Sequence, residues 1–435
     1  MKKQLALLPL AALLACSAPK TPYTEFEEAY HDVFHTITQI AVHDIFAPPV
    51  AARIYAYSSS AGYEVMAQSN DGYRSLHGQV NEFPLFPAPP KEHYVPEVAS
   101  LMAASSVGKA LVFSEDRMEA FQTELFDALA AHYTEEEMQT SMAYGELASR
   151  LVLEWARNDH YNQTRTFTKY EINDDPLRWK PTPPDYMDGI EPHWRNIRPF
   201  TLDSASQFKP VPPPTPSLDT TSEFWQDVLE VYHAVKDLKE EEEAIGKFWD
   251  CNPYVSVHRG HVMLATKKIT PGGHWIGITA IACRKAEADF ATTTNAYLRT
   301  SAGLHDGFIS CWDEKYRSNL VRPETVINEH IDESWQPLLQ TPPFPEYTSG
   351  HSVISAAASD MLTGIFGHSF SFQDSSERVY GLPDRFFESF YHASDEAGIS
   401  RLYGGIHYMP AIVEGLKQGH QVGKWVDSVL VTKIE

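Results

Sequence analysis

The sequence predicts an all-α protein built from two packed helical bundles. Apolar residues recur at helical spacing through much of residues 24–160 and again from about residue 220 to the end. A capping-box pattern, Thr134-Glu135-Glu136-Glu137, is one of several helix-start signals. We find no alternating strand run of useful length. With 435 residues and 43% apolar residues, the chain can form one large domain or two ordinary ones, with a substantial core.

Residues 17–165 are expected to form the N-terminal helical half. Helices are predicted over residues 98–112 and 118–132, and a third opens at the capping box and runs to about Arg157. One buried face of the third helix is indicated by apolar residues at helical spacing, namely Met142, Leu147, Leu151, Val152 and Trp155.

Residues 166–220 are different, because frequent prolines exclude long helices there. Aromatic residues such as Trp179 and Trp194 are scattered among the prolines, and a disordered linker would have fewer of them. We therefore expect an ordered, extended segment that wraps the helical body. Residues 221–435 are then expected to form the C-terminal helical bundle.

The net charge of −23 argues against nucleic acid as a partner and against binding to anionic membrane surfaces. Lysine and arginine are outnumbered in this chain, so a cluster of them would be informative.

The first 16 residues are typical of a lipoprotein signal peptide. A basic start at Lys2-Lys3 precedes a short apolar run, and Leu13-Leu14-Ala15-Cys16 resembles a bacterial lipoprotein cleavage box. We expect cleavage before Cys16, lipidation of its thiol, and an exported protein that is periplasmic or anchored to the outer membrane. An ordinary secretory signal cut nearby is the alternative. No later stretch is apolar enough for a transmembrane helix, so membrane contact is expected only through the lipid anchor.

Beyond Cys16 the chain has three cysteines, Cys251, Cys283 and Cys311, and no CxxC pair. An odd number makes a disulfide framework a poor interpretation, although a single bridge would suit an oxidising compartment. Each is expected to be a small buried apolar residue.

Three separate segments of the last third carry the chemistry. Lys315 and Arg322 are seven residues apart, so we expect both on one face of one helix that stops near Arg322, before Pro323. Alone, this pair would be two surface cations.

Ser349-Gly350-His351 is predicted to open the next helix, which ends near Gly367. Ser349 then lies near the N-cap, and the Gly350 N–H belongs to the unpaired amides that bind anions at helix starts. In isolation, this segment would be a serine cap with a structural histidine.

Arg401 and His407 flank Gly404-Gly405. The glycine pair predicts a turn that lets both side chains reach one site, with a final helix over about residues 409–430.

If the segments converge, they offer three cations, a hydroxyl beside a free N–H, and two imidazoles. This inventory suits a tetrahedral or trigonal-bipyramidal oxyanion such as phosphate or vanadate. The joint pattern K-x6-R-P, S-G-H and S-R-x5-H resembles the signature of the vanadium haloperoxidase and type 2 acid phosphatase superfamily. The chain is most similar to the bacterial iodoperoxidase-like haloperoxidases, with the closest match over residues 344–351.

The resemblance implies a fold of that superfamily, a vanadate cofactor and a set of site residues. Vanadate is expected to be bound by His407 as axial ligand and by Lys315, Arg322, Arg401, the Ser349 hydroxyl and the Gly350 N–H. His351 is implied as the acid–base group. Trp312 and Phe344 match positions close to the cofactor in these enzymes, and Asp313 and Tyr254 are further candidates.

The implied activity is oxidation of halide, iodide above all and also bromide, by hydrogen peroxide to hypohalous acid. One alternative is a phosphomonoesterase that uses the same pocket, with His407 as nucleophile and His351 protonating the leaving group. Another is a lipid-anchored protein that only binds an oxyanion. The sequence leaves open whether the protein is a monomer or a homodimer.

Other histidines have weaker signals. His258 and His261 have a loose metal-ligand spacing, but no carboxylate or cysteine set accompanies them. No spacing argument supports His274, His330, His392 or His420.

Overall fold

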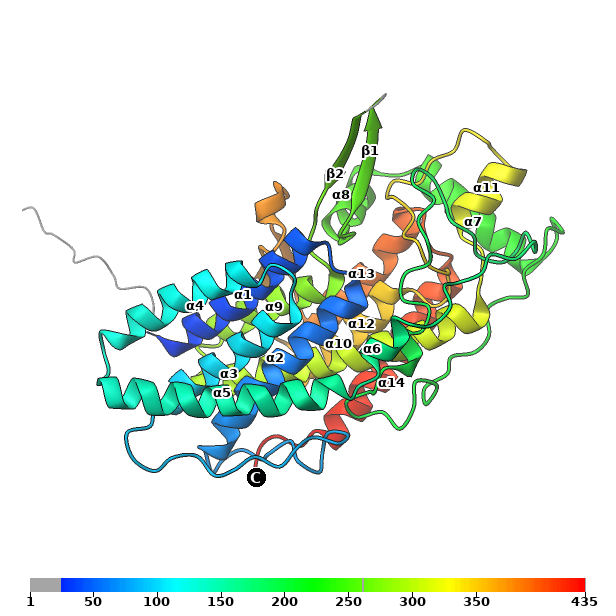
Figure 1. The fold of residues 1–435 in the computed structure, drawn as a ribbon. Coiled ribbons are helices and arrows are strands. Elements are labelled where there is room, and N and C mark those ends of the chain that lie inside the picture. Colours follow the sequence, from blue (N-terminus) through cyan, green and yellow to red (C-terminus); the bar gives the residue numbers. More distant parts are fainter. Residues whose placement is uncertain (1–24, 260–261, 435) are drawn as a thin grey trace, which may run out of the picture.

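The computed structural model describes residues 25–259 and 262–434, and it is mainly helical (Figure 1). The α-helices are α1 (Phe26–Asp44), α2 (Pro48–Gln68), α3 (Pro96–Leu111), α4 (Glu115–Ala130), α5 (Glu135–Arg157), α6 (Tyr161–Thr164), α7 (Glu223–Lys236), α8 (Glu240–Phe248), α9 (Pro271–Lys285), α10 (Phe290–Ser318), α11 (Pro323–His330), α12 (Gly350–Phe366), α13 (Phe390–Tyr403) and α14 (Met409–Val429). The short 3-10 helices are η1 (Trp194–Asn196) and η2 (Arg378–Tyr380). The all-α prediction is confirmed.

Helix starts follow the sequence signals closely. The Thr134 hydroxyl accepts a hydrogen bond from the Glu137 N–H, and the Glu137 carboxylate accepts one from the Thr134 N–H, so the predicted capping box is present. Ser349 caps α12 by accepting from the Ser352 N–H, and Gly367 ends that helix with a φ of 93°.

The structure adds two short hairpins that the sequence did not indicate. The described residues contain two antiparallel hairpins, β1 (Val255–Arg259) with β2 (Val262–Thr266), and β3 (Phe372–Asp374) with β4 (Arg385–Phe387). Each strand has three to five residues, which is too short for alternation to be recognised against helical spacing. The first hairpin projects from the helical body (Figure 1).

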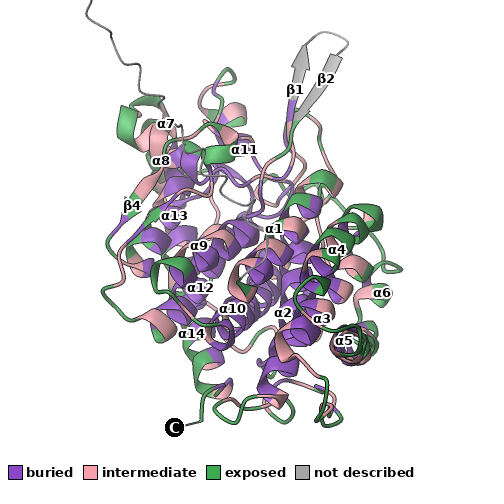
Figure 2. Ribbon diagram, turned by 90° about the vertical axis from the view of Figure 1, so that its left-hand side faces the viewer, coloured by how far each residue is buried: buried purple, intermediate pink, exposed green. Residues whose placement is uncertain are grey.

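One hydrophobic core connects the N-terminal helices with the C-terminal ones. Its buried residues include Phe34 and Tyr57 from the N-terminal half together with Leu304 and Met361 from the C-terminal half. Helix α10 is buried along most of its length, and the outer helices α4 and α5 expose one side (Figure 2). A smaller cluster, which includes Phe224, lies beneath α7, α11 and the start of α14.

Residues 165–222 contain little regular structure beyond η1, yet their aromatic side chains pack tightly. Trp179, Trp194 and Phe200 are all buried. The buried Asp306 carboxylate on α10 accepts hydrogen bonds from the N–H groups of Phe200 and Thr201, at 2.7 and 2.8 Å. These contacts fix the segment against the longest helix.

Helices α12 and α14 approach each other closely through glycines on α14. A Cβ added at Gly415 would lie 2.9 Å from the Ser352 Cβ, and one added at Gly423 would lie 2.6 Å from the Asp360 carboxylate. Because α14 packs on the start of α12, the residues just before α14 lie beside the α12 N-terminus.

Candidate active site

A cavity of about 470 Å³ lies where the start of α12 meets α10, the α13–α14 turn and the 165–222 segment. The predicted residues that line it are Tyr254, Trp312, Phe344, Gly350, His351, Arg401 and His407. Side chains far apart in the sequence are therefore brought to one place, and Lys315, Arg322 and Ser349 lie buried behind them.

Lys315 and Arg322 do not share one helix, contrary to the expectation. Helix α10 ends at Ser318, and Asn319 adopts a left-handed conformation with a φ of 49°. Arg322 is the extended N-cap of the next helix, and Pro323 is the first residue of that helix. Proline is well suited to a first helical position, so it marks a start here and not a stop. Both cations still point at the segment of residues 344–348.

The Lys315 ammonium is fully buried and donates to three main-chain carbonyls, those of Pro345, Glu346 and Thr348, at 3.0, 3.1 and 2.6 Å. It lies 5.0 Å from the centre of the Phe344 ring. Burial, with the positive charge of Arg322 adding to it, lowers the pKa of Lys315 to about 7. An anion nearby would favour the charged form.

The two arginines are also buried. Arg322 donates through Nε to the Phe344 carbonyl at 2.8 Å, whereas its Nη2 has no hydrogen-bond partner among the described residues. Arg401 donates to the Ser400 hydroxyl at 3.0 Å and to the Trp249 carbonyl at 2.6 Å. Burial lowers the pKa of each arginine to about 10, so both remain cations at neutral pH.

The start of α12 supplies neutral donors. Gly350 is the first helical residue, so its N–H is one of the amides that have no partner within the helix. A Cβ at this position would lie 3.5 Å from the Trp312 ring and 3.9 Å from the Lys315 Cε, so it would fill the space between the helix start and these two side chains. Glycine leaves that space open for an anion.

Glu346 orients His407, and the sequence did not predict this contact. The Glu346 carboxylate accepts from His407 Nδ1 at 2.8 Å and from the Tyr408 N–H at 3.0 Å through the same oxygen. With its proton on Nδ1, His407 has a lone pair on Nε2, which lies 3.2 Å from Arg322 Nη1. The sequence feature that could have indicated this role is a single carboxylate, Glu346, within the apolar and proline-rich stretch just before Ser349.

The pKa of His407 is held well below its usual value by burial and then by the charge of Arg322. The pKa of His351 is also lowered well below normal, by burial and then by the Arg401 charge. His351 Nε2 has no hydrogen-bond partner among the residues that the structure describes. Both imidazoles are therefore neutral, and one offers a free nitrogen beside the cavity.

The remaining candidates differ in position. Trp312 and Phe344 line the cavity with ring centres 5.0 Å apart, and Trp312 donates to the Ile190 carbonyl at 3.2 Å. Asp313 is not in the cavity lining; it pairs with Arg317 and lies 3.8 Å from an Arg195 nitrogen. Cys16 and the proposed signal peptide lie outside the described residues.

The arrangement fits a tetrahedral oxyanion. Three buried cations, one of them with an unpaired N–H, need negative charge, because an unpaired buried donor costs about 1–3 kcal/mol. The neutral His407 Nε2 can bond to the central atom of such an anion. These residues therefore fit vanadate as well as phosphate.

Comparisons with known proteins agree with this geometry. Residues 295–434 match the family model of the VCPO second helical-bundle domain. The chain is 51% identical to the protein described as the first bacterial vanadium-dependent iodoperoxidase, with a TM-score of 0.90, over 94% of this chain and 98% of that one.

Two more distant structures share the fold. They are bacterial vanadium-dependent chloroperoxidases in holo and apo form, 16% and 15% identical, with TM-scores of 0.68 and 0.67. The similarity covers 89% and 88% of this chain, and 93% and 95% of those chains, respectively. No curated protein sequence matches the chain.

Proposed function

The chain belongs to the vanadium-dependent haloperoxidases, and from this we propose that it oxidises iodide with hydrogen peroxide to hypoiodous acid. The main support for this activity is the buried set of three cations, Lys315, Arg322 and Arg401, around the neutral Nε2 of His407. The 51% identity to an iodoperoxidase supports iodide as the halide. Iodide is also the easiest of the common halides to oxidise.

The vanadate cofactor would be held by a set of side chains and one N–H. His407 Nε2 would bond to vanadium, and the oxygens would be bound by Lys315, Arg322, Arg401, Ser349 and the Gly350 N–H. When bound, vanadate supplies a Lewis acid that activates hydrogen peroxide without a change in its own oxidation state. Glu346 keeps the lone pair of His407 on the nitrogen that faces the site.

His351 would accept a proton from hydrogen peroxide. Its Nε2 is unpaired and borders the cavity, and its lowered pKa keeps it in the basic form. The fixed charges of Lys315 and the two arginines would withdraw electron density from the reacting oxygens without reorganising. Trp312 and Phe344 would provide an apolar wall on the side where a large, weakly hydrated halide approaches.

The test is iodide oxidation by the purified protein with hydrogen peroxide, before and after addition of orthovanadate. We expect triiodide formation that depends on vanadate and that is lost in His407→Ala. Bromide and chloride under the same conditions define the halide range. Hydrolysis of p-nitrophenyl phosphate is measured alongside. Phosphatase turnover that vanadate inhibits, without any peroxidase activity, would contradict the proposal and favour a phosphomonoesterase.

We also propose that the protein is exported and anchored by a lipid on Cys16. The support is the sequence alone, with its basic start, short apolar run and Leu-Leu-Ala-Cys box. In the described part of the chain, no helix is long and apolar enough to cross a membrane. Mass spectrometry of the N-terminal peptide would detect the lipid on Cys16. A Cys16→Ser variant that stays membrane-bound would contradict the anchor.

A further inference from the structure

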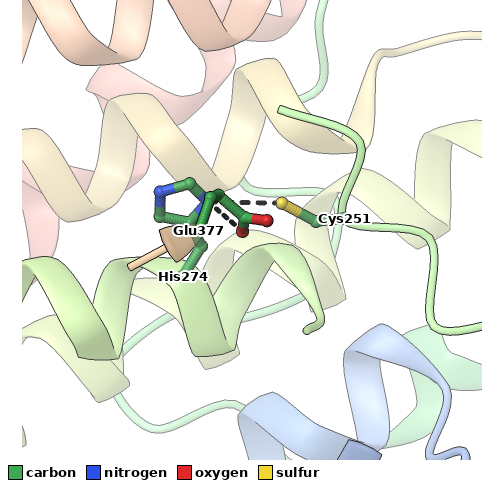
Figure 3. Close-up of side chains that lie close together, drawn as sticks. All are labelled: Cys251, His274 and Glu377. Carbon is green, nitrogen blue, oxygen red and sulfur yellow. Dashed lines mark hydrogen bonds and ion pairs between the residues drawn. The ribbon is translucent and has the colours of Figure 1, made fainter. Parts of the chain in front are cut away.

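A second cluster of buried polar side chains consists of Cys251, His274 and Glu377 (Figure 3). It adjoins the cavity, because Cys251 is one of the lining residues. Cys251 follows α8, His274 lies in the first turn of α9, and Glu377 precedes η2. All three are at most 1% exposed. The haloperoxidase chemistry proposed above uses none of them. They are far apart in sequence, which is why no ligand spacing signalled them.

The three side chains converge on one point. His274 Nδ1 lies 3.4 Å from the Cys251 sulfur and 3.3 Å from a Glu377 carboxylate oxygen, and all three ligand atoms lie within 4.8 Å of one another. Tetrahedral zinc has bonds of about 2.3 Å to sulfur and about 2.0–2.1 Å to nitrogen and oxygen, which place nitrogen about 3.6 Å from sulfur and about 3.3 Å from oxygen. The two separations from His274 Nδ1 agree with these values to about 0.2 Å, and the Cys251 sulfur lies within 4.8 Å of the Glu377 oxygen.

Glu377 is the member of the cluster that lacks hydrogen bonds. Neither of its carboxylate oxygens has a hydrogen-bond partner among the described residues, although one lies at ion-pair distance from His274. A buried carboxylate without hydrogen bonds is costly, and such groups are usually paired or bound to a metal. A cation between Glu377 and Cys251 would give this carboxylate a direct bond in addition to its ion pair with His274.

The outer contacts of His274 are those of a metal ligand. Its other nitrogen, Nε2, lies 2.8 Å from the buried Asp374 carboxylate, which orients the ring and aims Nδ1 at Cys251 and Glu377. Burial lowers the pKa of His274, but the Asp374 carboxylate and Cys251 raise it well above its usual value, so the ring is protonated before an ion binds. The ring also stacks on Trp249 at a distance of 4.6 Å between ring centres. The imidazole is thus held in place before any ion binds.

We propose that Cys251, His274 and Glu377 bind a divalent zinc ion, distinct from the vanadate cofactor. A thiolate, an imidazole and a carboxylate are the ligand types that zinc prefers, whereas magnesium and calcium avoid sulfur. On binding, the Cys251 thiol releases its proton to solvent and its sulfur forms the bond to zinc. His274 also releases its Nδ1 proton to solvent, bonds to zinc through Nδ1 and keeps the proton on Nε2, which faces Asp374. Cys251 also lines the cavity, which provides a route for the ion.

The role of the ion would be to fix the cavity wall. Cys251 is two residues from Trp249, whose carbonyl accepts the Arg401 hydrogen bond. Glu377 and Asp374 belong to the β3–β4 region, so the ion would join this region to α9 and to the chain after α8. Arg401 would then be held in position for an oxyanion.

The test uses full-length protein without vanadate, stripped with a chelator and titrated with Co²⁺ and Zn²⁺. We expect a thiolate-to-cobalt charge-transfer band that saturates at one Co²⁺ per chain and that disappears when Zn²⁺ is added. Cys251→Ser should abolish the band, and Glu377→Gln should weaken Co²⁺ affinity at least tenfold. Cys283→Ser, which removes another buried cysteine on α9, should leave both unchanged.

The acidic surface binds cations without selectivity, so stoichiometry alone does not decide the question. The charge-transfer band does, because it requires a sulfur ligand. Wild-type protein without the band, or a Cys251→Ser variant that keeps it, would overturn the proposal. The first result would show instead that Cys251 and His274 form a hydrogen-bonded pair between the two carboxylates. If Cys251→Ser does not fold, the Co²⁺ affinity of Glu377→Gln still tests the site.

Discussion

Glu346 decides which nitrogen of His407 is free to bind vanadium. In Glu346→Gln, the amide oxygen can still accept from Nδ1, but the negative charge that makes Nε2 more basic is lost. Burial raises the pKa of Glu346 to about 7, so the dialysis is run at pH 8, where the wild-type carboxylate is charged. We expect vanadate affinity to fall about tenfold, in line with the usual effect of such outer contacts. In Glu346→Ala the two donors on His407 and Tyr408 lose their acceptor, and affinity should fall further. Equilibrium dialysis with orthovanadate measures both.

Glu64→Gln is the matched control, because Glu64 is an equally buried carboxylate on α2 outside the cavity lining. Its variant should bind vanadate as wild type does. An equal loss of vanadate affinity in Glu346→Gln and Glu64→Gln would show that Glu346 affects binding only through the stability of the fold.

Lys315 predicts a pH dependence of vanadate binding. Its pKa of about 7 in the vanadate-free protein means that the ammonium is charged below that pH and loses its proton above it. Vanadate affinity should therefore fall as pH rises through 7, by up to about tenfold between pH 6 and pH 8 from this one group. Lys315→Arg keeps its charge over this range and should give a flatter profile. Protonation of free vanadate changes with pH in the same way for the wild type and for Lys315→Arg. Parallel profiles of vanadate affinity against pH for the two proteins would therefore show that the pH dependence does not come from Lys315.

At the residue scale, the polar residues that the sequence singled out lie close together in the structure. Lys315, Arg322, the Ser349–His351 turn, Arg401 and His407 all reach one buried region. Glu346 and the Cys251–His274–Glu377 cluster could not be predicted in this way. Their partners lie far away in the chain, and only packing brings these atoms together.

At the start of helix α12, the absence of a side chain on Gly350 leaves room for an anion. Gly350→Ala would add a Cβ at 3.5 Å or more from Trp312 and Lys315, which is ordinary contact. We expect the free energy of unfolding to stay within about 1 kcal/mol of wild type. The methyl group would occupy the space beside the Gly350 N–H, so vanadate affinity should fall at least tenfold. Urea unfolding and vanadate dialysis on the same preparation separate the two effects.

The glycines of α14 provide the contrast. A Cβ at Gly419 would overlap the Val353 carbonyl and lie 2.7 Å from the Ala356 Cβ, so α12 and α14 would have to separate. Gly419→Ala should lose about 1–3 kcal/mol of stability through overpacking. A Gly350→Ala variant destabilised as much as Gly419→Ala would show that Gly350 is needed for packing and not for the anion.

Helix boundaries show where local reasoning succeeds and where it fails. The capping box at Thr134 and the serine cap at Ser349 depend on neighbours within three residues, and both predictions are confirmed. Pro323 was interpreted as a stop because it follows a helical stretch, but proline is equally compatible with a first helical turn. The left-handed residue Asn319, which ends α10, has no strong sequence signature.

For the whole molecule, the sequence predicted helical bundles, but it did not reveal how they are joined. The core contains residues of α1–α5 together with residues of α9, α10, α12 and α14. Tyr297 of α10 stacks on Phe34 of α1 at 4.4 Å between ring centres, for example. Periodicity shows which face of a helix is buried, but it does not show which partner covers that face. The shared core makes the two halves depend on each other.

This shared core predicts cooperative unfolding of the described body. Calorimetry of the vanadate-free protein should show one transition, even though chains of this length often unfold in steps. Vanadate binds only residues of the C-terminal half under our proposal, yet it should move the whole transition upwards. At one hundred times Kd the gain is about 2.7 kcal/mol. Two transitions, of which vanadate shifts only one, would mean that the halves unfold separately despite their common core. His407→Ala should show the same single transition but no vanadate shift, because the variant keeps the core and lacks the bond to vanadium.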